Sequence, residues 1–352
     1  MTSKMLIAGG SGVTGQGAIN ALSEADWEIA TLSRAQQGQG NIPHLSADLL
    51  DVDSLRAHAE ALASVTHIFY AALKPSEDPK VEAQENGVMF RNLIEAVIEA
   101  GADLKRVIFV QGGKVYGAHL GVYKTPARED DSRHFPPNLY FEHEDLARTL
   151  PERGIGWTAL RPDIVIGHSL GSTMNMGNLI GIYGALCRQM GVAMQFPGTD
   201  AAYRVLVNTT SAHLLGESLV WAAENDQDGA FNITNGDQFR WKHLWPKVAE
   251  WFGLEVGEPQ PISLQERLNH ASAEKWQALA STHGLAVSDI NELAQGAFGD
   301  FIFNVEADAV FDVTKARRAG FHRMTLRSDD DLIAHLEDMV ARNLIPDPRK
   351  MT

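Results

Sequence analysis

The chain has a single cysteine, a deficit of positive charge and no long apolar run. Cys187 is the only cysteine among 352 residues, which excludes an intrachain disulfide and a metal site made of several cysteines. The 30 basic residues face 45 acidic ones, and the net charge of −15 argues against non-specific binding to nucleic acid or to an anionic membrane. No stretch reaches the roughly 18 apolar residues that a membrane helix needs.

The overall composition is that of a globular protein. Apolar residues make up 44% of the chain and charged residues 21%. A chain of 352 residues can form one large core or two lobes. Its first residues, Met1 to Lys4, lead directly into a strand-like run and show no signal-peptide pattern. We therefore expect a cytoplasmic protein without nucleic-acid or membrane partners, and we consider a homodimer as its assembly.

Several catalytic signatures are also missing. The sequence has no Gly-x-Ser-x-Gly elbow, so an α/β-hydrolase is unsupported. His119, His134 and His143 lie in one region but lack the i, i+4 spacing of a helical zinc pair. These histidines are expected to be solvated or capping residues, and no metal site is predicted.

Apolar runs and helix-like periods alternate over the first ~165 residues, which predicts a doubly wound parallel sheet of the Rossmann type. The runs lack strict alternation, as expected for strands that are covered on both faces. Strands are expected at 5–8, 27–32, 44–47, 66–72, 106–110 and 157–160, and helices at 14–25, 51–63, 80–99 and from 138 onward.

A later run, from Ala230 to Thr234, looks like one more strand of the same sheet. The sequence therefore predicts a Rossmann domain that binds NADP, formed by 1–167 plus about 204–236. A smaller, mostly helical substrate lobe is expected over about 168–203 plus 237–352. Its residues Met174, Met176, Tyr183 and Phe301 could line an apolar pocket, although core packing is the stronger expectation for each.

A glycine-rich turn follows the first expected strand. Gly9, Gly12 and Gly15 have the spacing Gly-x-x-Gly-x-x-Gly and open the first helix. Glycine permits a tight turn and a close approach of the backbone to a pyrophosphate, while the helix N-terminus supplies N–H donors and partial positive charge. With strand, turn and helix in the right order, the motif predicts dinucleotide binding.

The residues after the second strand favour NADPH over NADH. An acidic residue there would accept hydrogen bonds from the ribose 2′-hydroxyl, but this chain has Ser33 and Arg34. A hydroxyl and a guanidinium suit a 2′-phosphate, although Arg34 could also be a solvated surface residue. Asp48 and Leu49 follow the third strand and are expected at the adenine edge, with capping of the next helix as the alternative role of Asp48.

One lysine and one tyrosine stand where a Rossmann enzyme holds its nicotinamide. Lys114 comes just after the fifth strand, and Tyr140 lies in the first turn of a helix capped by Asn138. The usual short-chain dehydrogenase motif Tyr-x-x-x-Lys is absent from this helix, since Glu144 follows Tyr140. The segment from Tyr70 to Lys74 does match that motif, but it ends a buried strand and precedes a proline, so we interpret the match as chance.

These motifs resemble those of the progesterone 5β-reductase/iridoid synthase-like enzymes, an atypical branch of the extended short-chain dehydrogenase/reductases. The family's Gly-x-Lys-x-Tyr and Asn-Phe-Tyr-Tyr-x-x-Glu-Asp motifs are similar to 112–116 and 138–145. Similar stretches continue to the C-terminal half at 161–162 with Gly167, and at 196–199, 235–237 and 241–245. Two positions depart from the family pattern: Phe141 replaces a second tyrosine, and Asp163 replaces a glycine.

The resemblance implies NADPH-dependent 1,4-reduction of the C=C bond of an activated enone or enal. By resemblance, the family's catalytic lysine and tyrosine fall on Lys114 and Tyr140, and a small apolar enone or enal would be the substrate. The candidate cofactor contacts are Gly9, Gly12, Val13, Thr14, Gly15, Ser33, Arg34, Asp48, Leu49, Ala71, Ala72, Gln111, Lys114, Tyr140, Pro162 and Val165.

Other functions are compatible with such a fold. A nucleotide-sugar epimerase or dehydratase, or a carbonyl reductase, of the extended class would use NAD(P) but would want Tyr-x-x-x-Lys on the helix. Ser33-Arg34 and Glu144 speak against an epimerase. A non-catalytic NADPH sensor is the alternative outside enzymes, and the intact Lys114 and Tyr140 speak against it weakly.

Overall fold

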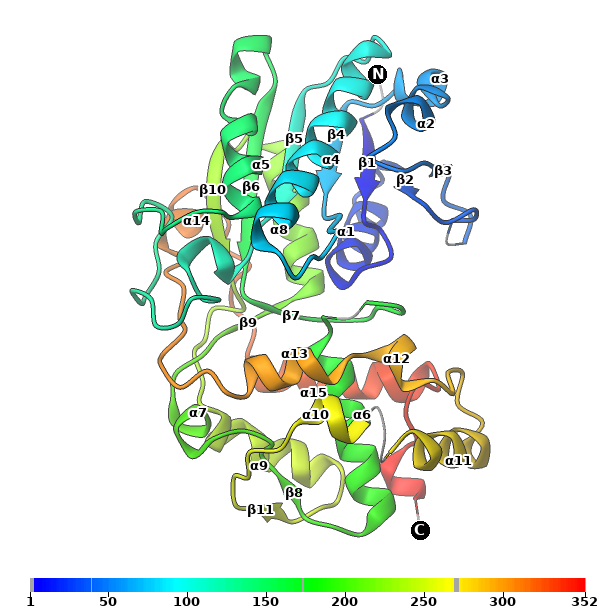
Figure 1. Ribbon diagram of the computed structural model, residues 1–352, viewed down its shortest axis with the longest axis vertical. Helices are drawn as coiled ribbons and strands as arrows, with labels where there is room; N and C mark the ends of the chain where they lie inside the picture. The colour runs from blue at the N-terminus through cyan, green and yellow to red at the C-terminus, as the bar shows by residue number, and fades with distance from the viewer. Residues whose placement is uncertain (1–2, 39, 173, 269–271, 352) are drawn as a thin grey trace. The chain divides into compact units, whose positions relative to one another are not determined.

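The computed structural model describes residues 3–38, 40–172, 174–268 and 272–351 and contains two compact units (Figure 1). The first unit comprises Met1–Asp163, His213–Ile233 and Asp312–His322. The second comprises Ile164–Ala212, Thr234–Phe311 and Arg323–Thr352. Each unit is therefore assembled from three separate segments of the chain.

The first unit is built on a seven-stranded sheet in which every neighbouring pair is parallel. The strand order is β10-β6-β5-β4-β1-β2-β3, so the direction of winding reverses between β1 and β4. Ligands of doubly wound sheets bind at such a reversal, beyond the carboxyl ends of the strands. The strands are β1 (Lys4–Ala8), β2 (Glu28–Ser33), β3 (His44–Ser46), β4 (His67–Tyr70), β5 (Arg106–Val110), β6 (Gly156–Pro162) and β10 (Gly229–Ile233).

Helices accompany these strands, and in the N-terminal segment they alternate with them as the sequence pattern predicts. They are α1 (Val13–Glu24), α2 (Val52–Arg56), α3 (Ala59–Leu62), α4 (Pro79–Glu99), α5 (Leu139–Ala147), α8 (Ala212–Glu224) and α14 (Thr314–Arg318), with 3₁₀ turns η1 (Gly113–Tyr116) and η2 (Leu150–Arg153). Asp78 caps α4 by accepting a hydrogen bond from Lys80 N, and Pro79 occupies the first position. The helix expected over 51–63 is split into α2 and α3.

Two close contacts set how these helices pack. A Cβ on Gly216 of α8 would lie 2.2 Å from the carbonyl oxygen of Gly17 in α1, so α1 and α8 approach nearly to backbone contact. On α4, Gly87 faces Glu142 of α5, and the Phe90 and His143 rings lie 4.7 Å apart. The α4–α5 contact matters for the site, because both helices carry site residues.

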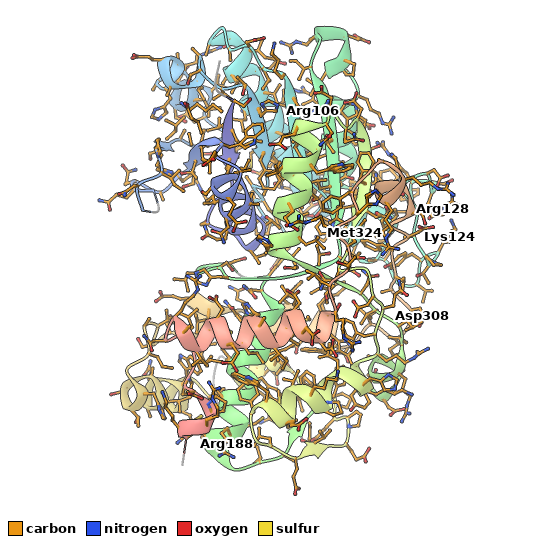
Figure 2. All side chains as sticks on the ribbon, turned by 180° about the vertical axis from the view of Figure 1, so that it is seen from behind. Arg106, Lys124, Arg128, Arg188, Asp308 and Met324 are labelled. Carbon is orange, nitrogen blue, oxygen red and sulfur yellow. The ribbon has the colours of Figure 1, made fainter. Side chains whose placement is uncertain are left out.

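The edge strand β10 is held by a buried arginine at the start of β5. Arg106, which is labelled in Figure 2, donates from Nη1 to Asp228 Oδ1 at 2.7 Å and to Gln227 O at 2.8 Å. It also donates to Thr158 Oγ1 of β6 at 3.2 Å. One cation thereby links β5 to β6 and to the residues that lead directly into β10, which helps a segment distant in sequence to complete the sheet.

The two units differ from the predicted lobes in four stretches. Asp312–His322 belongs to the first unit, where Lys315 of α14 donates to Ala230 O at 2.7 Å and lies over the Phe231 ring. Residues 164–167, 204–212 and 234–236 belong to the second unit, because β7 (Ile164–Ile166) pairs with β9 (Thr209–Ser211), and Asn235 N donates to Thr209 O. The predicted roles of the units in binding NADP and substrate stay predictions.

The second unit is mostly helical, as expected. Two short strands, β8 (Met194–Gln195) and β11 (Val256–Gly257), form a second pair in this unit. Its helices are α6 (Met176–Met190), α7 (Asp200–Arg204), α9 (Trp241–Trp251), α10 (Leu264–Glu266), α11 (Ala273–His283), α12 (Ile290–Leu293), α13 (Gly296–Ile302), α15 (Ser328–Ala341) and the 3₁₀ turn η4 (Pro348–Lys350). Arg188 of α6 donates to Gly253 O and Met351 O, which ties the C-terminal residues to this unit.

The late family-like motifs form the core of this unit. Phe196 packs edge-on against Trp245 at 5.3 Å and against Phe303 at 5.3 Å, and Trp241 also contacts Phe303. Gly198 leaves no room for a side chain beside Phe303. Of the four candidate pocket residues, Met176 is buried and Tyr183 is half-buried, whereas Met174 and Phe301 are exposed.

Among the described residues, none of the helices is both long and apolar enough to span a bilayer.

Candidate active site

Asn138 joins the two residues that the sequence singles out for catalysis. Its Oδ1 accepts a hydrogen bond from Tyr140 N at 2.9 Å, which caps α5, and its Nδ2 donates to Lys114 O at 2.9 Å. His134 Nε2 lies 2.8 Å from the same Lys114 oxygen. The 3₁₀ turn after β5 and the start of α5 are therefore fixed against each other by one buried amide. The cap was predictable from the sequence, but the second bond was not.

The Tyr140 hydroxyl lies against the backbone of Gly112. A Cβ on that glycine would be 3.4 Å from the hydroxyl oxygen and 3.9 Å from Pro162 O. Burial raises the pKa of Tyr140 to about 12, with a smaller contribution from the negative charge of Glu82. The phenol is therefore protonated at neutral pH and can donate a hydrogen bond to an oxygen that gains negative charge.

A third ionisable residue, Glu82 of α4, lies beside Lys114 and Tyr140. Its Oε2 lies 3.5 Å from Lys114 Nζ, and its side chain is 14% exposed against 44% for Lys114. No sequence signal pointed to Glu82, because it precedes Lys114 by thirty-two positions and stands in no recognised motif. Only the packing of α4 beside α5 and η1 brings it to the site.

A buried polar network links α5 to β6 and to the residue that follows β5. Gln111 Nε2 donates to Tyr140 O at 3.0 Å, and Arg161 Nε donates to Gln111 Oε1 at 2.7 Å. Arg161 Nη2 also donates to Glu144 Oε2 at 2.9 Å, and both side chains are almost fully buried. Glu144 stands at the position of the missing lysine, so here a buried ion pair replaces the Tyr-x-x-x-Lys partner.

The predicted cofactor residues around the glycine turn come together at the carboxyl end of β1 and β4. Gly9 has φ of +89°, and a Cβ there would lie 2.6 Å from the Ala71 backbone and 2.7 Å from Ala72 N. A Cβ on Gly15 would be 2.3 Å from Gly9 O. The first turn of α1 has no acidic residue, and Gly12 provides no side-chain cap, so its N–H groups suit an anion. The cradle fits a dinucleotide pyrophosphate.

The predicted 2′-phosphate residues lie at the end of β2. Arg34 is exposed and makes no hydrogen bond or ion pair with any other described residue. Ser33 Oγ accepts a hydrogen bond from Ala35 N at 3.2 Å, and His44 Nε2 lies 3.0 Å from Ala35 O. This short turn is thus ordered by local bonds and leaves the guanidinium available for a phosphate.

Other candidate cofactor residues have defined local roles. Asp48 Oδ1 accepts from Leu50 N, whereas Asp51 caps α2, and Leu49 O accepts a hydrogen bond from Asn92. The Gln111 side chain is committed to Tyr140 and Arg161. Val13 and Thr14 open α1, Pro162 ends β6 beside Gly112, and Val165 lies in β7 of the second unit. Contact of these residues with cofactor stays a prediction.

The remaining sequence candidates have structural partners. Tyr70 is buried in the core beside Phe90 and His143, and Lys74 pairs with Glu85 at 2.7 Å, so the Tyr-x-x-x-Lys match of this segment forms no site. The His119 and His134 rings lie 5.2 Å apart. Across the part of the chain that the structure describes, no group of three or more His, Cys, Asp or Glu residues could hold a metal ion.

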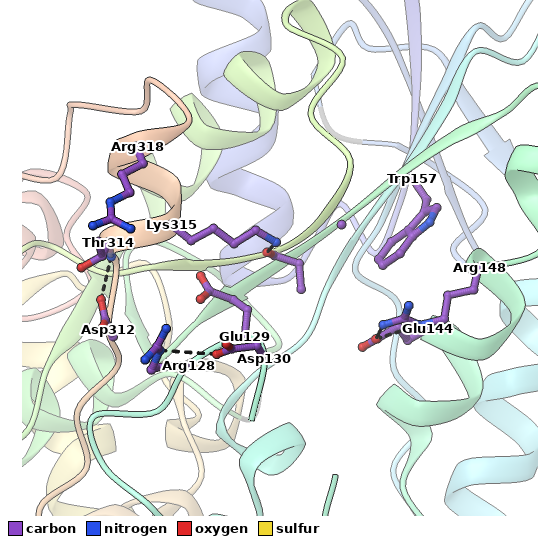
Figure 3. Close-up of a pocket in the computed structure, with 12 residues that line it drawn as sticks. Arg128, Glu129, Asp130, Glu144, Arg148, Trp157, Asp312, Thr314, Lys315 and Arg318 are labelled. Carbon is purple, nitrogen blue, oxygen red and sulfur yellow. Dashed lines mark hydrogen bonds and ion pairs between the residues drawn. The ribbon is translucent and has the colours of Figure 1, made fainter. Parts of the chain in front are cut away.

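A separate cavity of about 720 Å³ lies in the first unit between α5, β10 and α14 (Figure 3). Basic and acidic side chains balance on its wall: Arg128, Arg148, Lys315 and Arg318 against Glu129, Asp130, Glu144 and Asp312. Several are already paired, as Arg128 is with Asp130 and Glu144 with Arg148. Lys114 and Tyr140 do not line it, and we assign it no ligand.

Comparison with known proteins identifies the family. Residues 38–346 match the model of the PRISE-like Rossmann-fold domain. The chain belongs to this family. It is 29% identical to an (S)-8-oxocitronellyl enol synthase of Camptotheca acuminata, over 97% of this chain and 93% of that protein. It is 27% identical to a 3-oxo-Delta(4,5)-steroid 5-beta-reductase of Arabidopsis thaliana, over 97% and 92% of the two chains. The family resemblance inferred from the motifs is thus confirmed.

Solved structures confirm the fold of this PRISE-like chain. A UDP-glucose 4-epimerase of Thermus thermophilus, in complex with NAD, matches with a TM-score of 0.63 and 17% identity over 99% of this chain and all of that one. A GDP-mannoheptose C4 reductase of Campylobacter jejuni with NADP bound matches with a TM-score of 0.66 and 13% identity over 97% and 98% of the chains. The predicted Rossmann architecture is therefore correct.

Proposed function

We propose that this PRISE-like protein is an NADPH-dependent oxidoreductase that reduces the C=C bond of small activated enones or enals. The observation that carries the proposal is that Asn138 binds the backbones of both Lys114 and Tyr140, whose phenol is protonated, on a fold with a dinucleotide cradle. The names of relatives along nearly the whole chain, an enol synthase and a steroid 5-beta-reductase, support the same reaction class.

NADPH as the reductant is supported by the residues at the end of β2. Gly9 and Gly15 allow the pyrophosphate to approach the backbone, and the N-terminus of α1 offers N–H donors. The exposed guanidinium of Arg34 and the adjacent Ser33 hydroxyl would bind the 2′-phosphate. When bound, NADPH supplies the hydride.

The protein's part in the reaction is to stabilise the oxygen of the substrate carbonyl. Hydride addition to the β-carbon moves the electron pair of the C=C bond toward the carbonyl, which leaves negative charge on that oxygen as an enolate. Tyr140 donates its hydroxyl hydrogen bond to this oxygen, and the Lys114 ammonium adds positive charge nearby. Because the charge develops in the transition state, these donors stabilise it more than the ground state. Water then supplies the proton that completes the saturated product.

The test is NADPH oxidation by the purified full-length protein with a panel of small enones, enals and steroid enones. We expect consumption of NADPH and formation of the saturated carbonyl compound with at least one of them. If tightly retained NAD and epimerised nucleotide sugar are found instead, the epimerase alternative holds. If NADPH binds but no substrate turns over, the non-catalytic sensor alternative gains support.

A further inference from the structure

The face of α4 that meets α5 carries a carboxylate directly opposite the reacting tyrosine. Asn86 Nδ2 donates to Glu82 O at 2.8 Å, one turn back along α4, and His143 Nε2 lies 3.1 Å from Asn86 O. His143 in turn stands one turn after Tyr140 on α5. Residues 82 and 86 of one helix therefore face 140 and 143 of the other.

Glu82 is also poorly solvated and has few partners. Its side chain is 14% exposed, and Lys114 Nζ, at 3.5 Å, is the only cation with which it forms an ion pair in the described part of the chain. A carboxylate in such a place keeps much of its Coulomb effect on neighbouring groups, because little water screens it. Its charge opposes ionisation of the Tyr140 hydroxyl and so raises the pKa of that phenol, in addition to the larger effect of burial.

We propose that Glu82 is a positioning residue of the reductase site, which holds the Lys114 ammonium group in place by an ion pair. This inference rests on the proposed function, in which the Lys114 ammonium adds positive charge near the enolate oxygen. In the described part of the chain, Glu82 is the one carboxylate that forms an ion pair with Lys114.

Three substitutions test the role of the Glu82–Lys114 ion pair. Glu82→Gln removes the charge but keeps an oxygen that can accept from Lys114, Glu82→Ala removes both, and Glu82→Asp keeps the charge on a shorter side chain. The matched control is Glu85→Gln, because Glu85 stands on the same helix and pairs with Lys74 at 2.7 Å, away from the site.

The experiment measures kcat and KM of the full-length protein separately, with NADPH and an accepted enone at neutral pH. We expect Glu82→Gln and Glu82→Ala to lower kcat while KM for the enone changes little. The loss of kcat in Glu82→Ala should be on the order of 10-fold, less than the roughly 100-fold cost of an ångström-scale misplacement. Glu82→Asp should restore most of kcat, and Glu85→Gln should keep both constants.

Three results would overturn the proposal. They are an unchanged kcat in Glu82→Ala, an equal loss of kcat in Glu85→Gln, and a loss of kcat in Glu82→Asp as large as that in Glu82→Ala. Circular dichroism and thermal unfolding of each variant establish that it is folded, and cofactor binding is measured separately. If the unmodified protein reduces no enone with NADPH, the proposed function fails, and that failure is seen before any variant is compared.

Discussion

The Tyr140 hydroxyl is the single group on which the proposed chemistry depends most. Substitution by Phe removes one oxygen and keeps the ring, so the fold should survive. We expect kcat/KM to fall by roughly 100-fold or more, the scale of one lost oxyanion donor. Lys114→Ala should also reduce activity, and the double variant should lose less than the product of the two single losses, because both residues serve one oxygen.

Tyr70→Phe is the matched control for this prediction. The Tyr70 hydroxyl is buried and has no hydrogen-bond partner among the described residues, so its removal costs no bond. Steady-state kinetics on several enones should show near-normal rates for Tyr70→Phe and for Lys74→Ala. Near-normal rates for Tyr140→Phe would mean that its hydroxyl is dispensable and that hydride positioning alone drives the reaction.

Arg34 is the residue that we expect to distinguish the two nicotinamide cofactors. Its guanidinium is exposed and unpaired in the described part of the chain, so it is free to bind a phosphate. Loss of one charge-assisted phosphate contact costs on the order of 1.5–3 kcal/mol, so Arg34→Ala should weaken NADPH binding by roughly 10- to 100-fold. NADH binding, measured in the same fluorescence titration, should hardly change. An equal loss for both cofactors would contradict this role.

At the scale of elements, Asn138 couples η1 to α5. Asn138→Asp retains the acceptor for Tyr140 N, and so the helix cap, but it cannot donate to Lys114 O. We expect a clear loss of kcat together with a lower melting temperature, because a buried carboxylate oxygen would then face the Lys114 carbonyl. Asn138→Ala should lose both hydrogen bonds. About 1 kcal/mol of its loss in unfolding free energy should come from the missing helix cap. If Asn138→Asp is fully active, the bond between the two elements is not needed for catalysis.

The buried Arg161–Glu144 pair supports α5 from the sheet. Burial alone would raise the pKa of Glu144, but the hydrogen bond from Arg148 and the charges of Arg161 and Arg133 outweigh it and lower the pKa. The stabilisation is therefore present above the ordinary glutamate pKa and is lost as the pH falls through the lowered value. Glu144→Gln should lower the urea midpoint strongly at neutral pH, since removal of one buried partner costs roughly 3–5 kcal/mol.

The difference in urea midpoint between Glu144→Gln and the unmodified protein should shrink in acid. There Glu144 is protonated in both the folded and the unfolded state of the unmodified chain. Glu142→Gln, on the exposed side of the same helix, is the control and should behave like the unmodified protein. A difference that stays constant down to about pH 3, well below the ordinary glutamate pKa, would contradict the assigned charge state.

Elements with strong local signals were predictable from the sequence. The strand, glycine turn and helix from Lys4 to Glu24 follow from apolar run, spacing and helix period, and the structure has them within a residue or two. Asn138 was predictable as a cap, but its bond to Lys114 O was not, because the second partner of an amide is set by tertiary packing. Glu82 was missed for the same reason: α4 has no local sign of which helix it will face.

At the scale of the whole molecule, the fold class and the family were both predictable, and both are confirmed. The return of β10 to the sheet was predictable from its apolar run. The return of Asp312–His322 was not, since α14 is only five residues long and is held by Lys315 on the β10 backbone. A short segment late in the chain has no sequence pattern that predicts which earlier element it packs against.

The product of enone reduction tests the central claim most directly. The protein is incubated with NADPH and a conjugated enone that it consumes, and the product is identified by mass spectrometry and NMR. Because Tyr140 and Lys114 are proposed to stabilise an enolate and the helix lacks Tyr-x-x-x-Lys, we predict the saturated ketone as the main product. The allylic alcohol as the main product would show that hydride reaches the carbonyl carbon, and would contradict the 1,4-reductase account in favour of an ordinary carbonyl reductase.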